Sequence, residues 1–210
     1  MRTWDRWLQL GTIKTEMLRA GGLVWLDGDN GLRGDPLGPV MHLHDGAAEV
    51  FFFLDGRCRI EIGDTVSVVE AGHFVYVPPE VPHNLVKEGS GDLRLFFAVA
   101  PNFVDNKWRT TGFARDGWEG TTKVLRVSGP GALPGDGHLR SRAVRLQERV
   151  DGAVGEEERV YLVLQGAVRY VDSVLSGDLE QGDFVHVLAG RPHSLESDSA
   201  LVLEVTAASR

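Results

Sequence analysis

Short hydrophobic runs separated by turn residues recur along most of this chain. Each run is four to seven residues long, and apolar positions either alternate with polar ones or follow one another without interruption. Strands of this length, with turn residues about every 8–12 positions, are typical of a β-sandwich or barrel. The clearest runs are residues 50–54, 59–62, 65–69, 73–77 and 93–99. We therefore predict an all-β protein.

Two local patterns bear on this prediction. Asp55-Gly56 lies between two apolar runs and is a strong hairpin signal. A two-residue turn there would pair Glu49 with Ile62 and would put cross-strand partners on one face. The inner face would then carry Glu49, Phe51, Phe53, Cys58, Ile60 and Ile62, and the outer face Arg57, Arg59 and Glu61. The segment Trp4 to Ala20 fits either a short helix or an extra strand.

The second half of the chain repeats the first. With a shift of 110 positions, residues 49–85 align without a gap on residues 159–195, and twelve of the 37 positions are identical. An internal repeat of this kind indicates two copies of one structural unit. We expect one barrel at residues 1–105, a connector at 106–120 and a second barrel at 121–210.

Composition and charge exclude several classes of function. The chain is 42% hydrophobic and 25% charged, and its net charge of −8 argues against nucleic acid or an anionic membrane as a partner. The single cysteine, Cys58, forms no internal disulfide and is expected to be an inert buried thiol. No apolar run approaches the roughly 18 residues of a membrane span. Residues 1–7 carry charges and lack the apolar core of a signal peptide, so a cytoplasmic protein is expected.

The residues that indicate chemistry begin at His42. In a strand, residues i and i+2 face the same way, so His42 and His44 point together. Asp45-Gly46 is a plausible turn, after which Glu49 begins the next strand, and a further strand brings His83 alongside. Imidazoles with one carboxylate suit a first-row divalent ion and leave room for exogenous ligands.

These residues resemble the two motifs of the cupin superfamily, G-x5-H-x-H-x3-4-E-x6-G and G-x5-P-x-G-x2-H-x3-N. The matching positions are His42, His44, Glu49 and Gly56 in the first motif and Gly72, Pro78 and His83 in the second. The resemblance implies two tandem cupin barrels, each a double-stranded β-helix or jelly roll. It also implies one divalent metal ion held by His42, His44, Glu49 and His83.

The chain departs from these motifs at positions that are not ligands. Glu80 stands in place of the glycine of the second motif, and Lys87 stands in place of its asparagine. Glu80 either faces solvent at a turn or reaches over the mouth of the barrel as a charged rim residue.

The second copy keeps few of the ligand positions. At the shift of 110, three ligands become Gly152, Val154 and Arg159, and only His193 is retained. An arginine in place of the carboxylate repels a cation, so we expect a single metal centre in the amino-terminal barrel. His186 and His193 are expected to be hydrogen-bonded core or rim residues.

The order of an active first barrel and a degenerate second one is similar to the bicupin form of 3-hydroxyanthranilate dioxygenase. That resemblance implies an Fe(II) dioxygenase that uses O2 on a small aromatic or enolic substrate. The expected substrate pocket consists of Phe51, Phe53, Ile60 and Tyr76. Lys87 and Val40 stand where that enzyme family has carboxylate-binding arginines, which implies a different substrate.

Two alternatives stay open at this point. A Mn, Zn or Ni ion would suit a non-oxidative lyase, isomerase or cyclase, and a barrel without catalysis would be a small-molecule binder. No catalytic residue beyond the metal ligands is assigned, although Tyr76, Glu80 and His73 are the nearest candidate bases by sequence. Cupins commonly pair through edge strands, so both a homodimer and a monomer with two paired barrels fit the chain.

Overall fold

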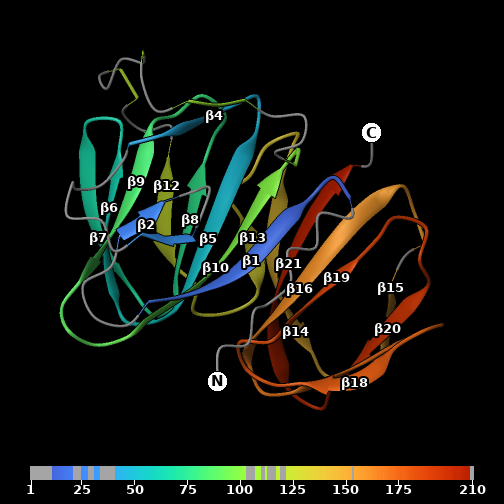
Figure 1. The fold of residues 1–210 in the computed structure, drawn as a ribbon. Coiled ribbons are helices and arrows are strands. Elements are labelled where there is room, and N and C mark those ends of the chain that lie inside the picture. Colours follow the sequence, from blue (N-terminus) through green and yellow to red (C-terminus); the bar gives the residue numbers. More distant parts are fainter. Residues whose placement is uncertain are drawn as a thin grey trace. The chain divides into compact units, whose positions relative to one another are not determined.

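The computed structural model describes residues 11–20, 25–27, 31–33, 41–102, 107–109, 112, 117–118, 122–152 and 154–208. All regular secondary structure in these residues is β-strand, which confirms the expected fold class (Figure 1). The described residues include no helix long and apolar enough to cross a membrane. The chain forms two compact units, whose described parts are residues 14–126 and residues 127–208 together with 11–13.

The first unit contains two large sheets and one strand pair. The larger sheets have the strand orders β1-β10-β5-β8-β12 and β3-β2-β9-β6-β7, and β11 pairs with β4. Its strands are β1 (Lys14–Ala20), β2 (Trp25–Asp27), β3 (Gly31–Arg33), β4 (Leu43–Asp45), β5 (Ala48–Asp55), β6 (Arg57–Ile62), β7 (Thr65–Glu70), β8 (His73–Val77), β9 (His83–Glu88), β10 (Leu93–Ala100), β11 (Lys107–Arg109) and β12 (Lys123–Arg126).

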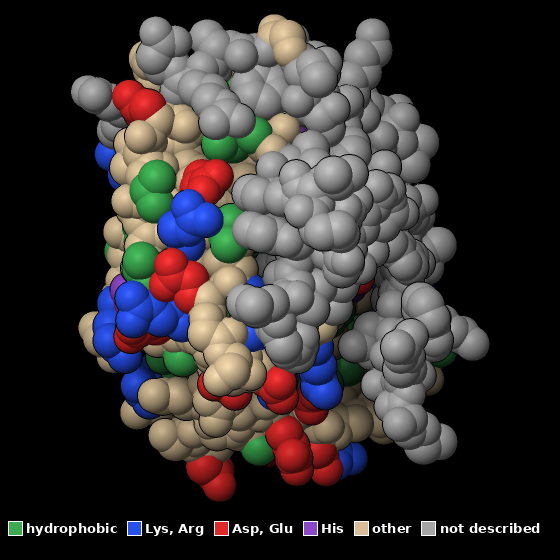
Figure 2. Space-filling model, turned by 60° about the vertical axis from the view of Figure 1, so that its left-hand side comes forward, with side chains coloured by type: hydrophobic (Ala, Val, Ile, Leu, Met, Phe, Trp, Pro, Cys, Tyr) green, Lys and Arg blue, Asp and Glu red, His purple; other side chains and the backbone are tan. Residues whose placement is uncertain are grey.

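The inner faces of the two large sheets form one apolar core. Alternate residues of β5, β6, β9 and β10 point into it, as expected for strands buried on one face. Phe51, Phe53, Cys58, Ile60 and Ile62 all lie in this core, so the predicted inner face is correct. On the outer face Arg57 and Arg59 form ion pairs with Glu61, Glu70 and Glu88. Acidic and basic side chains likewise lie side by side on the face shown in Figure 2.

The predicted hairpin at Asp55-Gly56 is wrong in its pairing. β5 bonds to β10 and β8 in one sheet, whereas β6 bonds to β7 and β9 in the other. The chain therefore crosses between the sheets at this turn, so that Glu49 pairs with Val77 and Val99 and Ile62 pairs with His83. The inner face was still predicted correctly because the period of two fixes side-chain direction whichever strand is the neighbour.

Gly56 makes this crossing possible. Its φ is +78°, a conformation that residues with a Cβ rarely adopt. A Cβ at this position would also stand 2.2 Å from the carbonyl oxygen of Asp92. Gly166 has the same φ in the second unit, and a Cβ there would stand 2.6 Å from the carbonyl oxygen of Ser199. Both copies thus depend on glycine for the same close approach of backbone to backbone.

The second unit repeats this architecture with two sheets, ordered β13-β14-β21-β16-β19 and β15-β20-β17-β18. Residues of its core stand at the repeat positions of the first core: Tyr161 matches Phe51, Val163 matches Phe53, and Val168 matches Cys58. Its strands are β13 (Gly131–Leu133), β14 (Arg140–Leu146), β15 (Val150–Gly152), β16 (Glu157–Gln165), β17 (Val168–Asp172), β18 (Ser176–Leu179), β19 (Phe184–Val187), β20 (His193–Glu196) and β21 (Ala200–Ala208).

The ends of the first unit are two edge strands of one sheet. β1 pairs with β10, so the described part of the segment Trp4 to Ala20 contains a strand over Lys14–Ala20, and residues 4–10 lie outside the described residues. At the other edge β12 pairs with β8. Most of the expected connector, residues 106–120, also lies outside the described residues.

Replacing Gly56 with alanine should destabilise the protein more than the same change at Gly89. Both glycines have a φ of +78°, but a Cβ at Gly89 meets nothing within 4 Å. We expect Gly56→Ala to lower the free energy of unfolding by about 3–5 kcal/mol and Gly89→Ala by about 1–2 kcal/mol. Urea denaturation of both variants measures this difference, and equal losses would contradict the steric role assigned to Gly56.

The thiol of Cys58 should be unreactive in the folded protein. Cys58 is fully buried in the first core, and burial raises the pKa of its thiol to about 12. Since the thiolate is the nucleophile, a disulfide reagent at pH 8 should modify Cys58 only after denaturant is added. Stoichiometric labelling of the native protein at the rate of a free thiol would show that this core opens readily.

Candidate metal centre

Four ligand-type side chains meet between the two large sheets of the first unit. His42, His44, Glu49 and His83 each offer one ligand atom, and these atoms all lie within 4.8 Å of one another. All four residues are buried. Across the described residues, this is the one group of His, Cys, Asp and Glu side chains that converges in this way.

The strands that carry these residues bring them together from distant parts of the chain. His42 and His83 exchange two backbone hydrogen bonds of 3.0 and 2.7 Å, which fixes the start of β9 beside the segment before β4. His44 follows two residues later on the same side, in β4. Glu49 comes from β5 in the opposite sheet. The cluster thus joins the two sheets, and its geometry depends on the fold of the whole unit.

A single carboxylate oxygen holds the group together. Oε2 of Glu49 lies 3.1 Å from Nε2 of His44 and 2.7 Å from Nε2 of His83. Burial by itself would raise the pKa of Glu49, but hydrogen bonds with His44 and His83 hold that pKa well below its usual range. Burial lowers the pKa of His44, and Glu49 partly opposes that shift. Glu49 is therefore an ionised carboxylate among imidazoles.

The orientation of His83 makes the group suitable for a cation. Its Nδ1 lies 2.9 Å from the carbonyl oxygen of Val81, and because a carbonyl only accepts, Nδ1 carries a hydrogen. In the neutral ring Nε2 then directs a lone pair at the carboxylate oxygen of Glu49. A shared cation, either a proton or a metal ion, removes the repulsion between this lone pair and the carboxylate oxygen. Second contacts of this kind commonly orient metal-binding histidines, and these four side chains can hold one metal ion.

Glu80 occupies a strained position next to this cluster. Its φ of +66° lies in the left-handed region, where glycine is favoured, and its repeat partner Gly190 has a φ of +74°. The backbone N–H of Glu80 donates to the carbonyl of His44 at 3.0 Å. Its carboxylate accepts a 2.8 Å hydrogen bond from the N–H of Gly46. Glu80 therefore ties the turn after His44 to the turn before His83, rather than pointing only at solvent.

The expected pocket residues divide between two faces. Phe51, Phe53 and Ile60 lie in the core that contains the cluster, and the Phe51 ring centroid is 6.2 Å from that of His83. Tyr76 pairs with Val50, while its neighbours Val75 and Val77 point into the core. The Tyr76 side chain therefore lies on the opposite face of the sheet. Once the pairing of β5 with β8 is known, strand alternation is enough to put Tyr76 and Phe51 on opposite faces of the sheet.

Two other candidate groups lie away from the cluster. His73 begins β8 at the end opposite Val77, and its Nδ1 contacts the backbone of Glu70. Lys87 lies on the inner face of β9, and Leu85 stands between it and His83 on that face. The Nζ of Lys87 donates a hydrogen bond to the carbonyl of Gly89 at 2.7 Å. Neither side chain is placed to act on a molecule bound at the cluster.

The sequence analysis did not single out Lys14, a buried charged residue of the first unit. It pairs with Val99 in β1 and is buried, with 3% of the residue exposed. Its Nζ lies 5.9 Å from the centroid of the Phe97 ring, which in turn lies 6.4 Å from the Phe51 ring. The Lys14 charge is close enough to His44 to contribute to the lowering of the pKa of that histidine. Only the strand assignment of residues 14–20, which the sequence left open, brings this lysine to the cluster.

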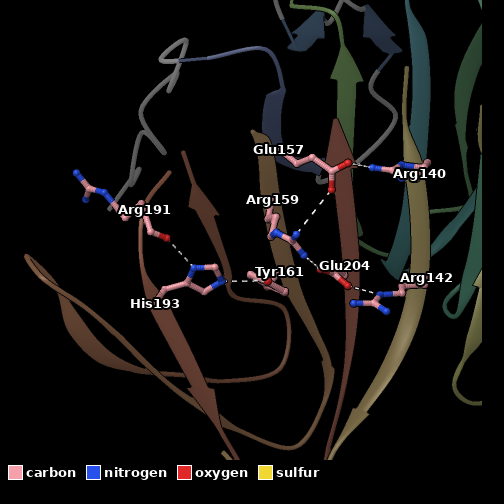
Figure 3. Close-up of polar contacts among 8 residues, drawn as sticks. All are labelled: Arg140, Arg142, Glu157, Arg159, Tyr161, Arg191, His193 and Glu204. Atoms are coloured by element: carbon pink, nitrogen blue, oxygen red, sulfur yellow. Dashed lines mark hydrogen bonds and ion pairs between the residues drawn. The ribbon is translucent and has the colours of Figure 1, made fainter. Parts of the chain in front are cut away.

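The second unit has a different arrangement at the equivalent place (Figure 3). Nδ1 of His193 lies 3.0 Å from the carbonyl oxygen of Arg191, as Nδ1 of His83 does with Val81, but its Nε2 contacts the hydroxyl of Tyr161 at 3.0 Å. A Cβ at Gly152 would stand 2.0 Å from Nε2 of His193, so the imidazole fills the space of the missing side chain. Arg159, at the repeat position of Glu49, bonds to Glu204 at 2.7 Å.

His186 also lies away from any group of ligands. Its Nε2 is 3.1 Å from the carboxylate of Glu158, which also accepts hydrogen bonds from the N–H groups of Thr12 and Ile13. Burial alone would raise the pKa of Glu158, but these hydrogen bonds lower it. His186 is thus a hydrogen-bonded residue of the second unit whose side chain is buried.

Comparison with known proteins agrees with the geometry of the first unit. Residues 34–99 match the family described as the cupin domain. An uncharacterised protein of Methanocaldococcus jannaschii is 25% identical over 64 residues, which are 30% of this chain and 51% of that protein. The chain thus spans about half the length of the curated relative that it matches.

Solved structures match over both units. A variant of salicylate 1,2-dioxygenase from Pseudoaminobacter salicylatoxidans is 14% identical with a TM-score of 0.69, covering 95% of this chain and 72% of that one. A structure of the same enzyme with gentisate adducts is 13% identical with a TM-score of 0.68, and the match covers 94% of this chain and 68% of that one. Protein Ylba from E. coli is 10% identical with a TM-score of 0.68, and the match covers 95% of this chain and 78% of that one. Residues 34–99 of the chain therefore match the cupin domain, and both units together share the fold of these solved structures.

Proposed function

We propose that the amino-terminal barrel is an Fe(II) dioxygenase site for a small aromatic or enolic acid. The observation that carries this proposal is the buried group of His42, His44, Glu49 and His83, whose ligand atoms lie within 4.8 Å of one another. Three imidazoles and a carboxylate suit a first-row divalent ion. When bound, such an ion supplies coordination positions for O2 and for a substrate oxygen.

The residues around the ligands favour a planar anion. The Phe51 ring lies beside His83, the Phe97 ring lies beside Phe51, and the buried ammonium of Lys14 lies over the Phe97 ring. In surroundings from which water is largely excluded, an ammonium attracts a carboxylate more strongly than it would at the surface. We infer that Lys14 holds the carboxylate of the substrate while the aromatic side chains pack against its ring. This inference is supported by the names of the structural neighbours, which include a salicylate dioxygenase with gentisate.

The metal content of the protein tests the proposed ligand set. Protein produced with iron and purified without oxygen should contain one iron per chain, and His83→Gln should reduce that content at least about tenfold. His193→Gln is the matched control, since His193 holds the repeat position in the second barrel and contacts Tyr161 instead of a carboxylate. Elemental analysis of the three proteins gives the result. Equal metal content in wild type and His83→Gln would refute the proposed ligand set.

Oxygen consumption tests the proposed reaction. The iron-loaded protein should consume one O2 per substrate with a hydroxylated aromatic acid such as gentisate or salicylate, and His83→Gln should consume none. An oxygen electrode measures this stoichiometry. One zinc, manganese or nickel per chain with no O2 uptake would instead indicate a non-oxidative lyase or isomerase, and absence of any metal would leave a binding protein.

The proposed role of Lys14 depends on its charge. Lys14→Met keeps most of the side-chain volume but removes the charge, so KM for acidic substrates should rise about 10- to 100-fold. Lys14→Arg should recover part of this loss, and the iron content of both variants should equal that of the wild type. Steady-state O2 uptake gives KM and kcat separately. A fall in kcat with unchanged KM would contradict a role in binding the carboxylate.

A further inference from the structure

The second barrel contains a positively charged cleft at one end of its inner face. β14, β21 and β16 lie side by side, and their inward side chains farther along the strands form the apolar core of the unit. At the end nearer Arg140, alternation brings charged residues to the same face, because Arg140 and Arg159 both pair with Thr206. The cleft has a volume of about 320 Å³. Its lining consists of Arg140, Ser141, Arg142, Glu157, Arg159, Glu204 and Thr206.

Carboxylates within the cleft hold the three arginines in place (Figure 3). Glu204, whose side chain is 3% exposed, accepts hydrogen bonds from Nη1 of Arg159 at 2.7 Å and from Nε of Arg142. Glu157 bonds to Arg140 and lies 3.7 Å from Nη2 of Arg159. Each guanidinium is therefore oriented before any ligand arrives, which reduces the entropy lost on binding.

The arginines keep donors that these contacts do not use. A guanidinium has five N–H groups, and Nε of Arg159 is buried without a hydrogen-bond partner. Arg140 and Arg142 are 60% and 61% exposed at the rim, whereas Arg159 is 15% exposed and lies deeper. Three guanidiniums and two carboxylates leave one net positive charge in the lining.

This cleft differs in sign of charge from the cluster of the first barrel. Arg159 stands at the repeat position of Glu49, and Tyr161 and His193 bond to each other at the repeat positions of Phe51 and His83. The charge of the second barrel therefore repels a cation and attracts an anion.

We propose that the carboxy-terminal barrel binds a small monocarboxylate at Arg140, Arg142 and Arg159. The guanidinium fork matches the two oxygens of a carboxylate, and one net positive charge balances a monoanion. Glu157 and Glu204 would repel the second charge of a phosphate dianion. The volume of the cleft lies at the lower end of the range for small-molecule sites, about 300–1,000 Å³. This site is separate from the proposed iron centre and does not depend on it.

Benzoate is a suitable probe, with acetate and inorganic phosphate beside it. Because the proposed function gives the first barrel its own carboxylate site at Lys14, the titration is made in Lys14→Met. Isothermal titration of that variant should show one benzoate per chain. Arg142→Gln should weaken benzoate binding at least about tenfold. Arg145→Gln is the matched control, because Arg145 is exposed on the opposite face of β14 and should leave the affinity unchanged.

Arg159 needs a paired variant, because removing it alone leaves Glu204 buried with one fewer partner. The double variant Arg159→Gln, Glu204→Gln removes both charges, and thermal unfolding checks that it is folded. Loss of benzoate binding in the folded double variant supports the proposal. Three results would overturn it: no binding of benzoate at millimolar concentration, unchanged affinity in Arg142→Gln, or phosphate binding tighter than benzoate.

Discussion

The burial of one carboxylate constrains the whole first barrel. An ionised carboxylate in an apolar core costs several kcal/mol unless charged or hydrogen-bonding groups surround it. Glu49 meets this requirement through His44 of β4, in the two-stranded sheet, and His83 of β9, in the large sheet opposite its own. The two sheets must therefore be in register to within the length of a hydrogen bond. The crossing at Gly56, the backbone pair His42–His83 and the contact from Glu80 to Gly46 all serve this requirement.

The sequence alone predicted the fold class, the duplication and the four residues of the cluster. These succeeded because alternation of period two and fixed spacing between ligands are properties of local sequence. The partner of β5 could not be predicted in this way, since a turn at Asp55-Gly56 fits both a hairpin and a crossing between sheets. The place of Tyr76 depended on the same register, and its side chain lies on the face opposite Phe51.

Lys14 illustrates a different limit. A charged residue in a segment of undecided secondary structure has no recognisable pattern, and only the pairing of β1 with β10 brings Lys14 to Phe97. The left-handed φ of Glu80 was likewise not predicted, although the motif that has glycine at that position indicated it. In both cases the missing information was a contact between residues far apart in the sequence.

Comparison of the two barrels shows how one scaffold carries opposite charges at one place. Much of the apolar core is kept at the repeat positions, while Arg159 stands where the first copy has the carboxylate of Glu49. Gly152 adds a consequence for the history of the chain. Because the His193 imidazole occupies the room that a side chain at residue 152 would need, a histidine there requires that imidazole to move away from Tyr161. The return of one ligand in the second barrel is therefore coupled to a rearrangement of the one ligand position that it still shares with the first.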